Sequence, residues 1–133
     1  MKKLILIVSI LFCAQINAQK NTKVSSLDFI QVINNNTKEA AFYYQNNWEI
    51  LRKMAIKKGY INSYQFLETK PSKETPFSYI LITTYKNKTQ FEQREKHFQE
   101  LIKEKGELQL LNSKKSKEFR KALYRKIVTH KES

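Results

Sequence analysis

The chain has 133 residues, enough for one domain and too few for two. Its 25 lysine and arginine residues outnumber 12 aspartate and glutamate residues, which makes it a basic protein with a formal net charge of +13. A hydrophobic content of 41% with only two glycines and two prolines excludes collagen-like, low-complexity and wholly disordered proteins. The single cysteine excludes a disulfide scaffold and any metal site built from several thiolates.

Residues 1–18 have the pattern of a secretory signal peptide. Lys2 and Lys3 form a charged start, residues 4–14 are an apolar run, and Ala18 is a small residue at a suitable cleavage site. An apolar helix of this length rises only about 16 Å, roughly half of a hydrocarbon core. We therefore expect an exported protein, periplasmic or secreted, with no transmembrane span after signal removal. Cys13 leaves with the signal peptide.

The mature chain keeps a strong excess of positive charge, which concentrates only between residues 114 and 126. An anion-binding module using this segment would be retained on heparin or DNA resins in a salt-dependent way. Elsewhere acidic and basic residues alternate, which is typical of a solvated surface. We expect no nucleic-acid partner.

The elements begin after a polar segment, residues 19–26, that we expect to be a flexible leader. Residues 27–33 alternate as a strand with apolar side chains on both faces and end in an asparagine-rich turn. Asn36, followed by Glu39, is placed to cap a helix over 38–58. That helix has one apolar stripe and ends at Gly59. The stripe consists of Ala41, Tyr44, Trp48, Leu51 and Ala55.

Two further strands are expected at 61–69 and 77–85, joined by a proline-containing loop over 71–76. In the second of them, Phe77, Tyr79, Leu81, Thr83 and Tyr85 share one face. A second helix starts at Asn87 as its cap and stops at Gly106. Its apolar stripe consists of Phe91, Phe98, Leu101 and Ile102.

The segment 114–130 has two interpretations. It fits one helix, and it also fits a short helix followed by a strand, and periodicity alone does not distinguish them. With a final strand, the domain over 27–130 has the order of a ferredoxin-like βαββαβ fold, an α+β protein whose antiparallel sheet carries both helices on one face. Residues 131–133 form a tail.

The expected sheet has more apolar surface than two helices on one face can cover. The first and third strands are apolar on both sides, and a large exposed apolar face is rare in soluble monomers. We therefore expect a homodimer in which two copies pack through the open sheet face.

Several sequence stretches resemble a group of exported bacterial proteins of uncharacterised function, which belong to the class of dimeric α/β barrels. The similarity covers about residues 27–130 and is carried by Asn47-Trp48-Glu49, Tyr64-Gln65-Phe66, the run YILITTY over 79–85 and the run FRKALYRKIV over 119–128. The resemblance implies a helix at 114–121 and a strand at 122–129. The class also includes stress-response proteins, small monooxygenases acting on aromatic compounds, and haem-degrading monooxygenases. The last branch has a histidine on its second helix, as His97 would be here, but its strand tryptophan has no counterpart in this chain.

The sequence contains no recognisable catalytic motif. Neither histidine has a second ligand at helical spacing, and the two glycines fit helix ends and not a phosphate-binding loop. We expect no metal site and no cofactor. His97 fits a half-exposed surface position and His130 a solvated one, with a ligand-binding or general-base role for His97 as the alternative.

The aromatic residues are the remaining indication of function. They fit core and interface packing, or an apolar cavity under the first helix with a tyrosine hydroxyl as its polar group. The candidate ligand-binding residues are Tyr44, Trp48, Tyr64 and His97. We expect a binding or stress-type module with a small apolar ligand. The alternative is a cofactor-independent monooxygenase or isomerase acting on a small aromatic or haem-like compound. A closed void under about 100 Å³ beneath Trp48 would favour the non-catalytic module, and an enclosed site of about 300 Å³ or more would favour the enzyme.

Overall fold

A computed structural model describes residues 22–131. The expected signal peptide and residues 19–21 of the expected leader lie outside the described residues. The first strand, β1 (Val24–Val32), starts three residues earlier than expected. Residues 24–26 are therefore buried strand and not flexible leader. Their polar members are satisfied there, because Ser25 pairs with Thr84 along the backbone and the two hydroxyls lie 2.7 Å apart.

The sheet has four antiparallel strands in the order β2-β3-β1-β4. The other strands are β2 (Ser63–Glu68), β3 (Tyr79–Tyr85) and β4 (Arg120–Thr129). Of the two interpretations of residues 114–130, the short helix followed by a strand is confirmed. The chain is thus an α+β protein, and β2 and β3 form the expected hairpin with a long loop.

The first helix runs without a break through three segments: α2 (Thr37–Tyr43), the π-helical η2 (Tyr44–Trp48) and α3 (Glu49–Lys57). The second is divided into α4 (Lys88–Glu92) and α5 (Arg94–Lys105), and a single turn, α6 (Ser116–Phe119), leads into β4. Asn87 caps α4 as predicted, because its side chain accepts a hydrogen bond from the Gln90 amide at 2.8 Å. Within residues 22–131, none of these helices combines the length and apolar character needed to cross a membrane.

Asn36 is the N-cap residue of the first helix as predicted, but its side chain makes no capping hydrogen bond. Its side-chain amide donates to the Glu118 carbonyl at 2.9 Å, and Asn34 donates to the same carbonyl at 3.0 Å. The asparagine side chains therefore tie the start of the first helix to α6 and do not accept a hydrogen bond from the first turn of the helix.

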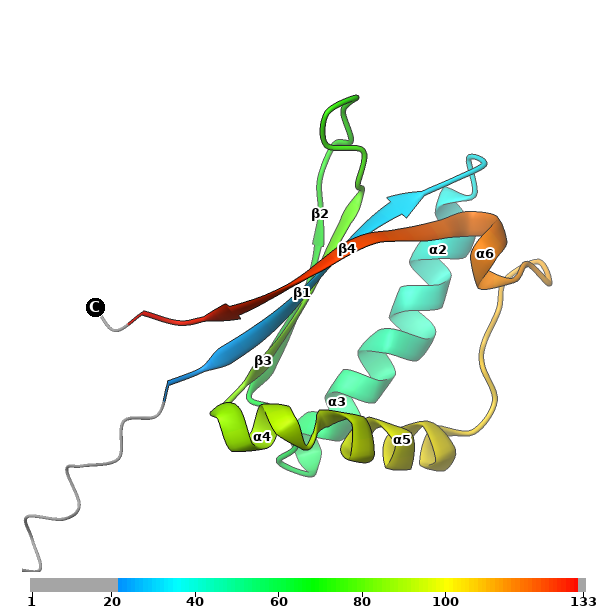
Figure 1. Ribbon diagram of the computed structural model, residues 1–133. Coiled ribbons are helices and arrows are strands. Elements are labelled where there is room, and N and C mark those ends of the chain that lie inside the picture. The colour runs from blue at the N-terminus through cyan, green and yellow to red at the C-terminus, as the bar shows by residue number, and fades with distance from the viewer. Residues whose placement is uncertain (1–21, 132–133) are drawn as a thin grey trace, which may run out of the picture.

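All helices lie on one side of the sheet (Figure 1). The first helix packs along β3 and β1, where one core cluster forms from Ile30, Ala40, Tyr44, Tyr79, Leu81 and Phe119. The helix α5 instead crosses one end of the sheet and contacts α3, where Ala55, Ile61, Tyr85 and Leu101 form a second cluster (Figure 1). Ile102 does not belong to the buried stripe, since it is 54% exposed. This crossing leaves the helix-facing side of β1 and β4 partly open.

The opposite side of the sheet, called the outer face here, carries an apolar row across all four strands. The backbone register aligns Leu67, Ile80, Phe29 and Tyr124 in this order. Phe77 lies on this side too, with its ring centre 5.0 Å from that of Phe29, and not on the face of Tyr79 as predicted. The reason is that Phe77 precedes β3, where strand alternation does not yet apply. No helix of residues 22–131 packs on the outer face (Figure 1).

A β-bulge interrupts the pairing of β4 with β1. Phe29 lies opposite Tyr124 and Ile30 opposite Ala122, so Leu123 has no partner. Side chains before and after a bulge follow opposite alternation. Arg120 and Arg125 therefore both face the helices, although five positions separate them.

Candidate ligand-binding site

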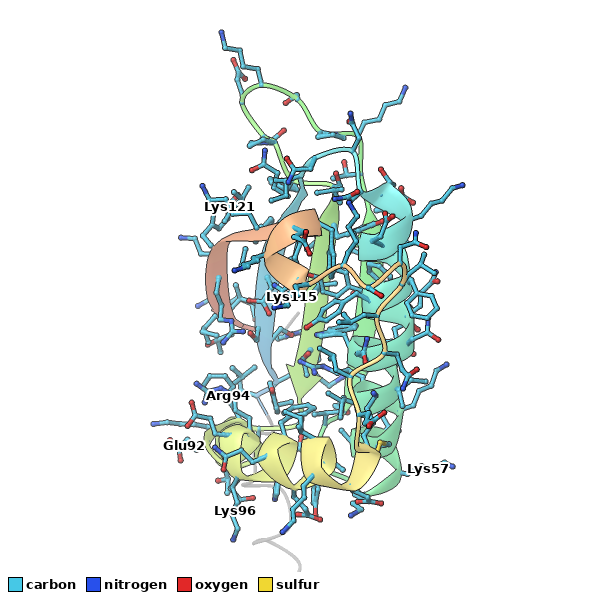
Figure 2. The ribbon with its side chains drawn as sticks, turned by 90° about the vertical axis from the view of Figure 1, so that its right-hand side faces the viewer. Lys57, Glu92, Arg94, Lys96, Lys115 and Lys121 are labelled. Carbon is cyan, nitrogen blue, oxygen red and sulfur yellow. The ribbon has the colours of Figure 1, made fainter. Side chains whose placement is uncertain are left out.

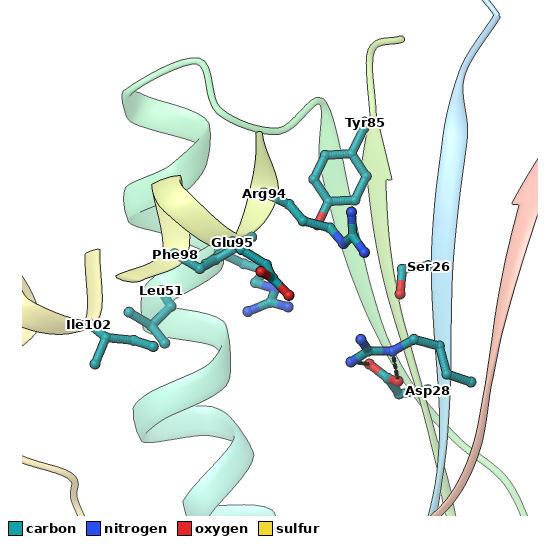
Figure 3. A pocket seen from close by; sticks show the side chains of 10 residues that line it. Ser26, Asp28, Leu51, Tyr85, Arg94, Glu95, Phe98 and Ile102 are labelled. Atoms are coloured by element: carbon teal, nitrogen blue, oxygen red, sulfur yellow. Dashed lines mark hydrogen bonds and ion pairs between the residues drawn. The ribbon is translucent and has the colours of Figure 1, made fainter. Parts of the chain in front are cut away.

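Two adjoining cavities lie on the helix-facing side of β1 and β4, and we call them together the trough. One holds about 200 Å³ and lies beneath the first helix. The other holds about 220 Å³ and reaches α5. They share Asp28, Arg52 and Arg125. Figure 3 shows the second cavity, between Ser26 and Asp28 of β1 on one side and Glu95 and Phe98 of α5 on the other.

Arg52 of α3 lies where the two cavities meet. Its guanidinium carbon is 4.5 Å from the centre of the Trp48 ring and 4.2 Å from that of Phe98. Its Nε donates to the Thr83 hydroxyl at 3.0 Å. No carboxylate among residues 22–131 forms an ion pair with it. Burial therefore lowers the pKa of Arg52 to about 10, and the group still carries its charge at neutral pH.

Arg120 of β4 supplies a second guanidinium to the cavity beneath the first helix. It lies over the rings of Tyr43 and Tyr44, at 5.1 and 5.8 Å. Its buried Nε and the buried Tyr44 hydroxyl have no hydrogen-bond partner among residues 22–131. Burial raises the pKa of Tyr44, so this hydroxyl stays protonated and remains a donor. Buried donors without acceptors are rare in folded proteins.

Asp28 is the acidic side chain that both cavities share. Its two oxygens accept from Nε and Nη2 of Arg125 at 2.6 and 3.2 Å, a two-pronged ion pair. This pairing raises the pKa of Arg125. The two cavities together are lined by more basic than acidic residues: Arg52, Arg94, Arg120 and Arg125 against Asp28 and Glu95. The trough is therefore positively charged.

The wall of the trough contains the π-helical segment η2, a feature often found at functional sites. Asn47 of this segment is 3% exposed and makes four hydrogen bonds. Its Nδ2 donates to the carbonyls of Tyr43 and Gln109 at 2.9 and 2.7 Å, and its Oδ1 accepts from the Gln109 amide and from Lys105 Nζ at 2.8 and 3.0 Å. Asn47 thus fixes the loop after α5 to the first helix.

The structure brings together part of the expected site. Tyr44 and Trp48 both line the cavity beneath the first helix. Tyr64 packs against the Trp48 ring at 5.6 Å and donates to Glu49 at 3.2 Å, but it does not line the trough. His97 lies elsewhere, stacked at 3.7 Å on Tyr60. The 200 Å³ cavity is neither the small void nor the large enclosed site considered above.

The arginines of the trough were not among the expected site residues. Arg52 follows Trp48 by four positions, a helical spacing at which a cation and an aromatic ring meet, and this signal is readable from the sequence. Arg120 and Arg125 belong to the basic segment 114–126, but that segment forms no single patch. Its Lys121 and Lys126 project to the outer face.

The described residues contain no cluster of three or more histidine, cysteine, aspartate or glutamate side chains that would suit a metal ion. The donors of the trough instead suit an oxygen acceptor or an anion. Comparisons with family models, curated proteins and solved structures found no match to this chain.

Proposed function

We propose that this protein is an exported, homodimeric binding protein that holds a small ligand with an apolar body in the trough. One observation carries the proposal: the cavity beneath the first helix is walled by Tyr43, Tyr44 and Trp48, and the buried hydroxyl of Tyr44 has no partner among residues 22–131. Concave sites with apolar walls and a few polar groups are typical of ligand pockets. At ~30 Å³ per water, 200 Å³ is the space of about seven waters, so the ligand is small.

The arrangement favours binding over catalysis. A general base needs a free acceptor of suitable pKa near the ligand. Asp28 is occupied by Arg125, and the raised pKa of Tyr44 keeps its hydroxyl protonated at neutral pH. His97, the histidine expected at the site, lies outside the trough. The monooxygenase or isomerase alternative therefore gains no support from these residues.

The ferredoxin-like fold and the homodimer belong to the same proposal. Read from its β4 edge, the strand order is β4-β1-β3-β2, as two split strand-helix-strand units would give. The apolar row on the outer face supports a second copy as its cover, because both copies would present the same surface about a two-fold axis. A standard interface buries about 800 Å² per partner, and we expect the face of one such sheet to supply it.

Trp48 is the only tryptophan of the chain, so its fluorescence reports directly on the trough. We expect a saturable change when the mature protein, residues 19–133, is titrated with benzyl alcohol or benzoate. Tyr44→Phe should weaken binding about 3- to 10-fold, because it removes one hydrogen-bond donor. The control Tyr60→Phe removes a hydroxyl outside the trough and should bind as the wild type does. Absence of saturable binding of both probes would refute the proposed function.

A further inference from the structure

We infer that the trough selects an anion: its ligand is a small aromatic or apolar acid whose charged group takes the unpartnered donors of Arg52, Arg120 and Tyr44. This inference rests on the proposed function and specifies its ligand class. Four features of the trough support it in turn.

The first feature is the position of Arg52. A guanidinium moved from water toward the interior loses hydration, and a buried charge is normally compensated by an opposite charge. The rings of Trp48 and Phe98 lie close to the group and Thr83 accepts from its Nε, but no carboxylate within residues 22–131 forms an ion pair with it. The planar ends of the guanidinium are the part that matches a carboxylate or phosphate in two-pronged geometry. An anionic ligand would supply the missing charge.

The second feature is the nature of the orphaned groups. Arg120 Nε–H and the Tyr44 hydroxyl are both buried donors without a partner within residues 22–131, and they belong to two residues that line the same cavity as Arg52. A neutral ligand with one acceptor would satisfy one of them. A carboxylate has two oxygens and about four acceptor positions, so it can satisfy several donors at once.

The third feature is the charge balance. Asp28 is already bound to Arg125, so the acid of this cavity is not available to Arg52 or Arg120. The bulge at Leu123 adds to the excess of positive charge in the cavity, because it turns both Arg120 and Arg125 toward the helices. Three guanidinium groups and one carboxylate leave the cavity beneath the first helix positive.

The fourth feature is the wall of the cavity, which determines the chemical nature of the uncharged part of the ligand. The same cavity is lined by the rings of Tyr43, Tyr44 and Trp48 and by Ile30 and Leu81. Inorganic phosphate would leave these apolar surfaces in contact with water. A flat apolar body with a single carboxylate, of the size of benzoate, uses both the walls and the donors.

The test compares benzoate with benzyl alcohol, a neutral molecule of nearly the same shape, by calorimetry and Trp48 fluorescence on the mature protein near pH 7. We expect benzoate to bind at least about tenfold more tightly, and this preference to weaken as salt is added. Arg52→Met and Arg120→Met should each remove most of the preference. The matched control is Lys96→Met, which removes one positive charge from an exposed position of α5 that points away from the trough (Figure 2).

Each outcome decides the matter. Equal binding of benzoate and benzyl alcohol would overturn the anion selectivity and leave the proposed function intact, whereas binding of neither would overturn both. The anion selectivity would also be overturned if Arg52→Met and Arg120→Met still preferred benzoate over benzyl alcohol as strongly as Lys96→Met does. Thermal melts check that the variants fold, and Arg52→Lys, which keeps the charge, should retain part of the preference if charge is the cause.

Discussion

Arg52 shows how a single residue can serve binding at a cost to stability. Its charge lies close to two aromatic rings, and cation–π contacts of this kind are worth about 0.5–2 kcal/mol. That gain offsets only part of the loss of hydration, which is why burial lowers its pKa. Arginine suits the position better than lysine because a guanidinium is flat and weakly hydrated.

A second set of charged residues has a structural role on the opposite side of α5. Lys58, at the end of the first helix, donates to Glu100 and Glu104 at 2.9 and 2.6 Å. Tyr60 donates to both oxygens of Glu100 at about 3 Å and stacks on His97. These contacts fasten α5 to the end of the first helix.

This cluster predicts a loss of stability in acid. Hydrogen bonds from Lys58 and Tyr60 hold the pKa of Glu100 below its ordinary value of 4.5. The stabilisation is therefore complete above about pH 4.5 and is lost as the pH falls through the lowered value. Thermal melts should show Glu100→Gln below the wild type near pH 7, with the difference shrinking as the pH falls below 4.5. Glu74→Gln, on the exposed hairpin loop, should show no such pH-dependent difference, and a constant difference for Glu100→Gln would contradict the assignment.

Among the elements, those with a clear period could be predicted from the sequence. The first helix and the strand β3 follow because Tyr44 and Ala55 recur at helical spacing, and Leu81 and Tyr85 alternate, so that tertiary packing and local pattern agree. Three features escape this reasoning. The π-helical segment and the Asn36 side chain bound to Glu118 have hydrogen-bond partners more than 60 positions away. The bulge at Leu123 depends on one extra residue in a strand.

The same limit applies to the candidate site. Tyr44 and Trp48 could be assigned because the helix stripe points at the sheet. Arg120 and Arg125 could not, since regular alternation would place them on opposite faces and only the bulge brings them to the same side. Asp28 carries a weaker signal: it is the charged residue of β1, at an inward position between apolar residues.

The connection between the first helix and the loop after α5 can be tested through Asn47. Asn47→Ala removes four hydrogen bonds of a buried side chain and leaves the backbone amide and carbonyl of Gln109 without this partner. We expect a loss of about 2–4 kcal/mol in the free energy of unfolding, measured with urea. The neighbouring Asn46→Ala is the control, because Asn46 donates only to Phe42 and should cost under about 1 kcal/mol. Equal effects would show that the loop is not held by Asn47.

At the scale of the whole molecule, the sheet separates two kinds of surface. The helix-facing side has the cores and the charged trough, whereas the outer face has the row of Leu67, Ile80, Phe29 and Tyr124. Tyr124 stacks on Phe29 at 4.6 Å and is still 49% exposed. Such a face is costly to leave in water.

The proposed homodimer makes this face the place to disrupt assembly. Ile80→Lys puts a charge at the centre of the outer face and should convert the dimer to a monomer, as measured by light scattering at micromolar concentration. Ile56→Lys, at an exposed apolar position of α3 on the other side of the sheet, should remain dimeric. Native mass spectrometry of protein from its own host would add the subunit count, the cleavage point after residue 18 and any bound molecule. A wild-type protein that stays monomeric would refute the dimer.

The crossing of α5 over the end of the sheet has a kinetic consequence. Because α5 does not lie along β1 and β4, the trough opens sideways to solvent and no helix has to move aside before a ligand enters. Exchange should then be fast, governed by diffusion and by the long-range pull of the arginines on a negative solute. A bound ligand would dissociate quickly, so the fraction of protein with ligand bound would follow the concentration of free ligand almost without delay.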